Sequence, residues 1–157
     1  MIDPGALASI GGAVALIAGL IGSAIGIATA ASGGLATLAE DPRQFRNVLI
    51  LASLPMTQSF YGLIVMILVI TSVLPNMPAE GSAGAVALGV SLISAFAFGF
   101  SAVYQGTVCA SGIAMLPKTG GKILTSSMML AVFVELIAVL ALVFTIMAFT
   151  LLGLMGG

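Results

Sequence analysis

Four long apolar segments dominate the chain, and short polar connections separate them. The segments cover residues 6–38, 48–74, 83–116 and 123–155. Each is longer than the roughly 20 residues that an α-helix needs to cross a bilayer. Their apolar runs are continuous, whereas the strands of a membrane barrel would alternate apolar and polar residues in segments of about ten. The pattern therefore predicts an all-α membrane protein with four transmembrane helices.

The first and third segments share one arrangement of small residues. In both, small residues follow one another at alternating spacings of four and three: Ala15, Gly19, Gly22, Gly26 and Thr29, then Ala95, Gly99, Ala102, Gly106 and Cys109. The second set lies 80 residues after the first. This internal repeat predicts two tandem helical hairpins, residues 1–78 and 79–157, that form one integrated domain.

A stripe of small residues along one face of a membrane helix lets two backbones approach closely. Glycine otherwise disfavours a helix by roughly 1 kcal/mol relative to alanine, so its abundance here needs a packing reason. Two explanations remain open. The stripes serve ordinary packing within the helical bundle, or they place the first and third helices at the crowded inner wall of a ring, with the second and fourth helices outside.

Composition and charge narrow the class of protein further. The chain is 61% hydrophobic and 6% charged, with a net charge of −1, so it has no basic face for nucleic acid. All of its basic residues lie in the first and third connections: Arg43, Arg46, Lys118 and Lys122. Because basic loops tend to stay in the cytoplasm, we expect a multi-pass cell-membrane protein with both termini on the outer side.

Nothing in the chain supports catalysis of the soluble type. It has no histidine, and its single cysteine, Cys109, has no partner for a disulfide. The stretch KTGGK at 118–122 lacks the spacing of a phosphate-binding loop. We therefore expect a chain that is not itself catalytic.

Two prolines affect the second helix: Pro42 precedes the apolar segment 48–74, and Pro55 lies inside it. Asp41 before Pro42 predicts a helix N-cap with proline in the first turn. Pro55 has no N–H group, so it cannot donate the intrahelical hydrogen bond to the carbonyl of Leu51. The helix is therefore expected to kink or open locally beside its polar residues.

Glu135 is the one charged residue inside an apolar segment. Only apolar residues fill the following positions, 136–144. A carboxylate at such a depth costs about 2.5 kcal/mol or more, which makes it a candidate functional residue by default.

Polar groups near Pro55 offer partners for that carboxylate. Leu54, Thr57, Gln58 and Tyr61 are spaced i, i+3, i+4 and i+7 and so lie on one helix face, and the third helix adds Gln105. Hydroxyl, amide and main-chain oxygens suit a hard cation, and one carboxylate neutralises one monovalent ion. A proton would need fewer donors. Sodium is therefore favoured, and the proton stays as the alternative.

Several motifs resemble the proteolipid subunit, called K or c, of V-type sodium-translocating rotary ATPases. They are the duplicated hairpin, LPMTQSFYG at 54–62, YQG at 104–106 and the lone glutamate of the fourth helix. The resemblance covers essentially the whole chain. It implies sodium ligands at the main-chain oxygen of Leu54, Thr57, Gln58, Gln105 and Glu135, with Tyr61 hydrogen-bonding the carboxylate.

The resemblance also implies a function and partners. Copies of the chain would form a rotor ring that carries Na⁺ on Glu135 past a stator subunit with an arginine. Central-stalk subunits would contact the basic loops, lipids would surround the ring, and ATP hydrolysis or synthesis would reside in partner subunits. Two alternatives remain: a proton-carrying ring of the same family, and a small four-helix proton-coupled multidrug exporter. The exporter does not need a glycine stripe, and it would want more aromatic residues around its substrate.

Overall fold

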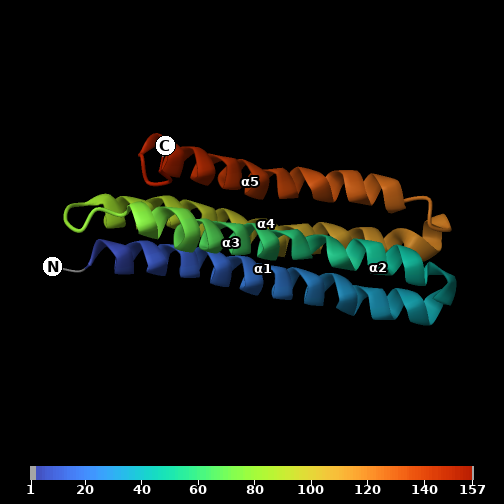
Figure 1. The fold of residues 1–157 in the computed structure, drawn as a ribbon. Helices are drawn as coiled ribbons and strands as arrows, with labels where there is room; N and C mark the ends of the chain where they lie inside the picture. Colours follow the sequence, from blue (N-terminus) through green and yellow to red (C-terminus); the bar gives the residue numbers. More distant parts are fainter. Residues whose placement is uncertain (1–2, 157) are drawn as a thin grey trace.

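The computed structural model describes residues 3–156, and every regular element within them is a helix. The longer elements follow one another in the order α1 (Pro4–Glu40), α2 (Phe45–Ser53), α3 (Thr57–Leu68), α4 (Ala83–Thr119) and α5 (Leu124–Leu151) (Figure 1). Because α2 and α3 belong to one span, Pro42–Asn76, the described chain has four helical spans long and apolar enough to cross a membrane. The predicted all-α fold with four spans is confirmed.

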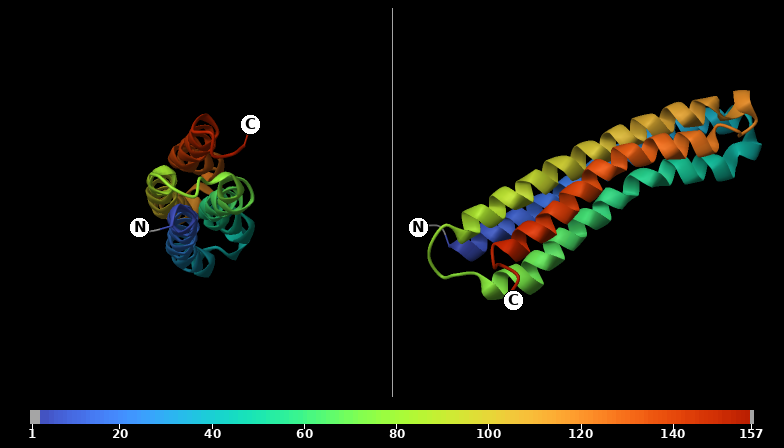
Figure 2. Two further views of the ribbon diagram at one scale, coloured as in Figure 1. Left: turned by 60° about the vertical axis from the view of Figure 1, so that its left-hand side comes forward. Right: turned by 90° about the horizontal axis from the view of Figure 1, so that it is seen from above.

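The spans form one elongated, gently curved bundle (Figures 1 and 2). α1 and α4 run in the same direction, and the span Pro42–Asn76 and α5 run in the opposite direction. The described chain begins and ends at one end of the bundle, beside the connection 77–82. The connections at 41–44 and 120–123 lie at the other end, so the basic residues share that end.

Two of the helices are much longer than a bilayer requires. α1 and α4 have 37 residues each, and α5 has 28. At 1.5 Å per residue, α1 and α4 are about 55 Å long, against a hydrocarbon thickness of about 30 Å. Both helices must therefore tilt or extend beyond the apolar part of the membrane.

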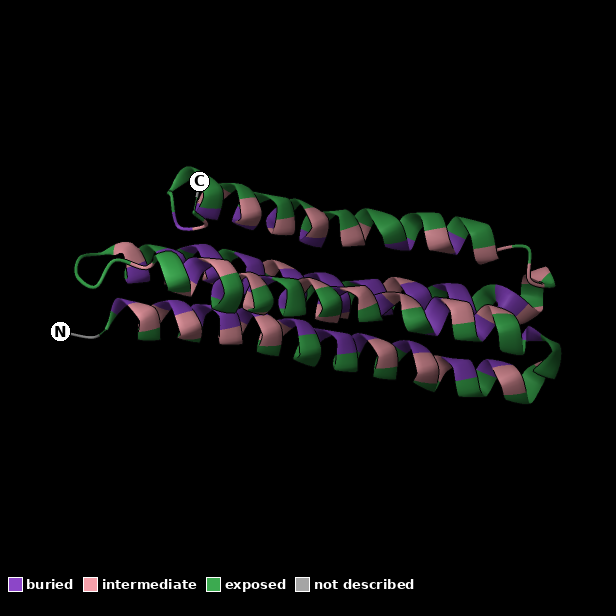
Figure 3. Cartoon of the chain, viewed as in Figure 1, coloured by how far each residue is buried: buried purple, intermediate pink, exposed green. Residues whose placement is uncertain are grey.

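α1 and α4 pack backbone against backbone along their small residues. A Cβ atom at Gly22 would lie 2.8 Å from the Cα atom of Gly99, and the main chain of Gly26 meets Gly106. The buried side of α1 faces the rest of the bundle along its whole length (Figure 3). The repeated stripe therefore makes close backbone packing within the chain, and this packing is compatible with both explanations.

The second span also packs against the small-residue stripe of α1. A Cβ atom at Gly19 would lie 2.5 Å from the carbonyl oxygen of Gln58, and a Cβ atom at Gly62 would lie 2.7 Å from the carbonyl oxygen of Ala15. The span Pro42–Asn76 thus lies against α1 at the depth of its polar residues.

The start of the second span follows the sequence prediction. Asp41 accepts a hydrogen bond from the main-chain N–H of Arg43 at 3.2 Å and from its Nε atom at 2.9 Å. Pro42 opens a 3₁₀ turn, Pro42–Gln44, that leads into α2. The guanidinium of Arg43 and the amide of Gln44 lower the pKa of Asp41 to about 2. The predicted N-cap is confirmed.

The end of the fourth helix differs from the sequence prediction. The apolar run continues to residue 155, whereas α5 ends at Leu151. Gly153 takes a left-handed φ of 70°, and the N–H of Leu154 donates to the carbonyl of Phe149 at 2.9 Å. This closing motif ends a helix inside an apolar run because glycine adopts positive φ without steric cost.

Candidate ion-binding site

Pro55 opens the second span beside its polar residues. The chain there tightens into a 3₁₀ turn, Leu54–Met56, and the N–H of Thr57 donates to the carbonyl of Leu54. Because Pro55 lacks an N–H, an unbroken α-helix cannot satisfy the carbonyls of the preceding turn. The predicted local opening is confirmed, and it separates α2 from α3.

Three oxygen atoms converge at this opening. The hydroxyl oxygen of Thr57 lies 3.3 Å from the carbonyl oxygen of Leu54 and 3.2 Å from Oε1 of Gln58. Both neighbours are hydrogen-bond acceptors, whereas a hydroxyl carries one proton. The cluster is therefore rich in oxygen lone pairs and short of protons.

Glu135 receives donors from two other helices. Its Oε1 atom accepts a hydrogen bond from the hydroxyl of Tyr61 at 2.7 Å, and its Oε2 atom accepts one from Nε2 of Gln105 at 3.1 Å. Tyr61 lies on α3, Gln105 on α4 and Glu135 on α5, so the carboxylate joins three helices. The bond from Tyr61 is the one that the resemblance implies.

Gln58 and Gln105 connect the carboxylate with the three oxygens. Both side chains are fully buried. Nε2 of Gln58 donates to Oε1 of Gln105 at 2.9 Å, and Nε2 of Gln105 also donates to the carbonyl of Ala131 at 3.3 Å. The structure thus brings all six sequence-predicted residues into one hydrogen-bonded cluster, although the amide oxygen of Gln105 points toward Gln58 rather than toward Glu135.

Ser101 belongs to the same cluster, and sequence reasoning missed it. Its hydroxyl donates to the carbonyl of Val134 at 2.9 Å and accepts a hydrogen bond from Nε2 of Gln58 at 3.2 Å. A usable signal was present in the sequence. Ser101 precedes Gln105 by four residues and so shares its helix face, and the 80-residue repeat places Ile21 at the equivalent position.

No basic side chain neutralises Glu135 within residues 3–156. The ion pair in this part of the chain joins Arg43 to Asp41 at the end of the bundle. A carboxylate inside a membrane requires a counter-charge or a proton. The cluster can therefore bind one small monovalent cation or one proton.

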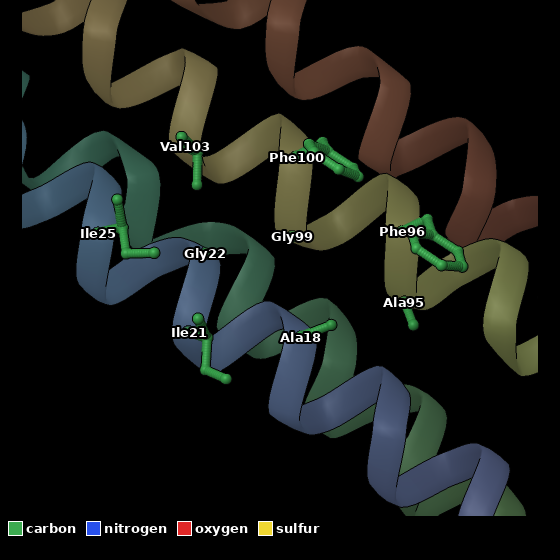
Figure 4. A pocket seen from close by; sticks show the side chains of 9 residues that line it. All are labelled: Ala18, Ile21, Gly22, Ile25, Ala95, Phe96, Gly99, Phe100 and Val103. Atoms are coloured by element: carbon green, nitrogen blue, oxygen red, sulfur yellow. The ribbon is translucent and has the colours of Figure 1, made fainter.

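Two hollows on the described surface of the bundle are lined mainly by apolar residues. One, of about 220 Å³, lies between α1 and α4 and has only hydrocarbon side chains in its wall, including Ile21, Ile25, Phe96 and Phe100 (Figure 4). Another, of about 360 Å³, lies between α4 and α5, with Ser101 in its wall. Neither contains a charged residue.

Comparison with known proteins identifies the family. Two segments of the chain, residues 10–69 and 88–148, each match the family of the ATP synthase C subunit. The chain belongs to this family. Its members assemble into rotor rings, so the chain is a multi-pass membrane protein of the rotor type. The multidrug exporter is not supported.

Two relatives are similar over most of the chain. The A-type ATP synthase subunit K of Methanocaldococcus jannaschii is 39% identical over 142 residues, which are 86% of this chain and 60% of that protein. The V-type sodium ATPase subunit K of Enterococcus hirae is 35% identical over 131 residues, which are 83% of this chain and 82% of that protein. The chain thus spans less than two thirds of the first relative and most of the second. The predicted V-type proteolipid is confirmed.

Proposed function

We propose that this member of the ATP synthase C-subunit family works in the rotor ring of a V-type ATPase or ATP synthase and carries Na⁺ across the membrane on Glu135. The observation that carries the proposal is the convergence of three oxygens, from Leu54, Thr57 and Gln58, with one proton among them. Such a set suits a hard cation better than a proton. The Enterococcus hirae relative, named as part of a sodium ATPase, supports the same choice.

Gln105 is the proposed fifth ligand. Its amide oxygen accepts a hydrogen bond from Gln58, and its nitrogen faces Glu135. A turn of this amide is therefore needed before its oxygen can reach the ion. Tyr61 holds the carboxylate from the other side throughout, so that only one of the two donors to Glu135 must move.

Charge explains how the ion travels with the rotor. Na⁺ on the carboxylate forms a neutral pair, which can pass through lipid at far lower cost than a lone charge. We propose that an arginine of a stator subunit releases the ion from Glu135 by offering an opposite charge to the carboxylate. ATP hydrolysis or synthesis belongs to partner subunits.

The arrangement of the ends supports an orientation and further partners. We propose that the end of the bundle with Arg43, Arg46, Lys118 and Lys122 faces the cytoplasm and contacts central-stalk subunits. Both termini then face outward. The hairpins 1–78 and 79–157 are proposed as duplicated units, since each contains one match to the family. α1 and α4 are placed at the inner wall of the ring, and lipids surround it.

Carbodiimide labelling of Glu135 in the purified ring tests the proposed ion. Bound sodium shields the carboxylate, so labelling should slow in sodium and not in potassium. Sodium and protons compete for one carboxylate, so protection should need more sodium as the pH is lowered. Glu135→Gln is the control and should not be labelled. Equal labelling in the two salts at every pH would instead indicate a proton-carrying ring.

A further inference from the structure

We infer that Ser101 is a positioning residue for the ion site: it holds the amide of Gln58 with its oxygen turned toward Thr57. This inference rests on the proposed function of the site. Ser101 is 4% exposed, and its hydroxyl touches neither Glu135 nor Thr57. Its effect on the ion must therefore pass through Gln58.

The direction of the hydrogen bonds at Ser101 is chemically fixed. The carbonyl of Val134 can only accept, so the single hydroxyl proton of Ser101 is committed to it. The oxygen of Ser101 can then only accept from the other side. The group of Gln58 that faces Ser101 must be its NH₂ group, as the 3.2 Å bond from Nε2 shows.

A second main-chain carbonyl imposes the same orientation through Gln105. Ala131 lies one turn before Val134 on α5, and its carbonyl accepts from Nε2 of Gln105. The amide oxygen of Gln105 must therefore face Gln58, which again has to offer its NH₂ group. The hydrogen bonds to Ser101 and to Gln105 thus both fix the NH₂ group of Gln58 and act as its two anchors. The Oε1 atom of Gln58 is therefore left facing Thr57.

Ion binding removes one of these two anchors. When the amide of Gln105 turns its oxygen to the ion, its bond with Gln58 is lost, whereas the bond between Ser101 and Gln58 is kept. Ser101 alone then prevents the amide of Gln58 from turning its NH₂ group toward the cation. Loss of the serine hydroxyl should therefore weaken the sodium-bound state far more than the proton-bound state.

The test compares four purified rings: wild type, Ser101→Ala, Ser101→Thr and Ser94→Ala. Ser101→Thr keeps the hydroxyl, and its added methyl group can enter the hollow of about 360 Å³ that Ser101 lines. Ser94 is the matched control, because it is a buried serine of the same helix that bonds Thr145 across the same α4–α5 interface, about two turns away. Carbodiimide labelling is measured against sodium concentration and, without sodium, against pH.

Ser101→Ala should raise the sodium concentration for half-protection on the order of tenfold, the effect of one lost hydrogen bond of about 1 kcal/mol or slightly more. Its labelling profile against pH without sodium should match the wild type, and Ser101→Thr and Ser94→Ala should keep wild-type protection. The inference fails if Ser101→Ala is protected like the wild type, or if Ser94→Ala loses protection equally. If sodium does not protect the wild type, the proposed function fails as well.

Discussion

The two hairpins share a scaffold and differ in charge. α1 and α4 have equal lengths and meet along their small residues. The two family matches start at residues 10 and 88 and end at residues 69 and 148, so they place Thr57 or Met56 of the first hairpin opposite Glu135 of the second. With either offset the carboxylate has a neutral counterpart in the first hairpin, and Met56 is 45% exposed.

This difference divides the work of one site between the hairpins. The second hairpin supplies the charge of Glu135, the donor Gln105 and the hydroxyl of Ser101, which accepts from Gln58. The first hairpin supplies the neutral oxygens around Thr57 together with Tyr61. One charge is enough for one monovalent cation. A second carboxylate nearby would need a second cation or a proton, so an asymmetric pair of hairpins suits a single-ion site.

Removal of the charge should have the largest effect. Glu135→Gln should abolish ATP-driven ²²Na⁺ uptake by liposomes that contain the whole complex, because a neutral amide leaves the charge of the cation uncompensated. The double variant with Met56→Glu should not restore uptake, since Tyr61 and Gln105 face position 135 and Met56 is exposed. Uptake by the double variant would mean that the hairpins are interchangeable.

Tyr61→Phe should have the next largest effect. It removes the 2.7 Å hydrogen bond to Glu135, and a bond to a charged group contributes about 1.5–3 kcal/mol. Sodium affinity should therefore fall about ten- to hundredfold in equilibrium ²²Na⁺ binding. The matched control is Tyr104→Phe in the second hairpin, because Tyr104 is 60% exposed on α4. Similar losses in both variants would contradict a specific role for Tyr61.

A third prediction separates the two small-residue stripes. Gly22→Ala should destabilise the protein by about 1–3 kcal/mol, because the new Cβ atom would lie 2.8 Å from the Cα atom of Gly99, and backbone cannot move aside. Gly99→Ala should cost much less, since its nearest contact, the carbonyl oxygen of Ala18, lies at 3.4 Å. Thermal unfolding in detergent checks both variants. Equal losses would mean that the stripes are equivalent.

The smallest expected effect is a pH dependence at the basic end of the bundle. The pKa of Asp41 falls from an ordinary 3.8 to about 2, so its contribution to stability is complete above about pH 3.8 and is lost as the pH falls toward 2. In the other connection at this end, the N–H of Gly120 donates a hydrogen bond to the carbonyl of Pro117, and this bond involves no carboxylate. The protection of the amide against hydrogen exchange, corrected for the intrinsic pH dependence of exchange, should therefore fall at Arg43 and not at Gly120 over this range. A parallel fall at both amides would assign the change to general unfolding.

Much of the fold follows from strong local signals in the sequence. Continuous apolar runs specify membrane helices, and the missing N–H of Pro55 specifies where the second span opens. The end of α5 at Leu151 was not predictable from hydropathy, because apolar residues continue beyond it and the closing turn depends on one glycine, Gly153. The π-helical turn Val69–Val73 likewise contains no glycine or proline that would mark it in the sequence.

The site was predictable in its residues and not in its hydrogen bonds. A charge and several amides inside apolar segments stand out, so Glu135, Gln58 and Gln105 are identifiable without a structure. Serine is common on the buried faces of membrane helices, so Ser101 is marked only by its spacing of four from Gln105 and by Ile21 at the equivalent position of the repeat. Its role depends on the carbonyl of Val134, which only the packing of α5 against α4 brings within reach.

Equilibrium binding of ²²Na⁺ to the purified ring, counted per chain at alkaline pH, tests the central claim most directly. The account predicts saturable binding of about one sodium ion per four-helix chain, unaffected by excess potassium, weakened by acid and absent in Glu135→Gln, in keeping with one membrane carboxylate for one ion. No saturable binding at any pH, or undiminished binding by Glu135→Gln, would contradict it.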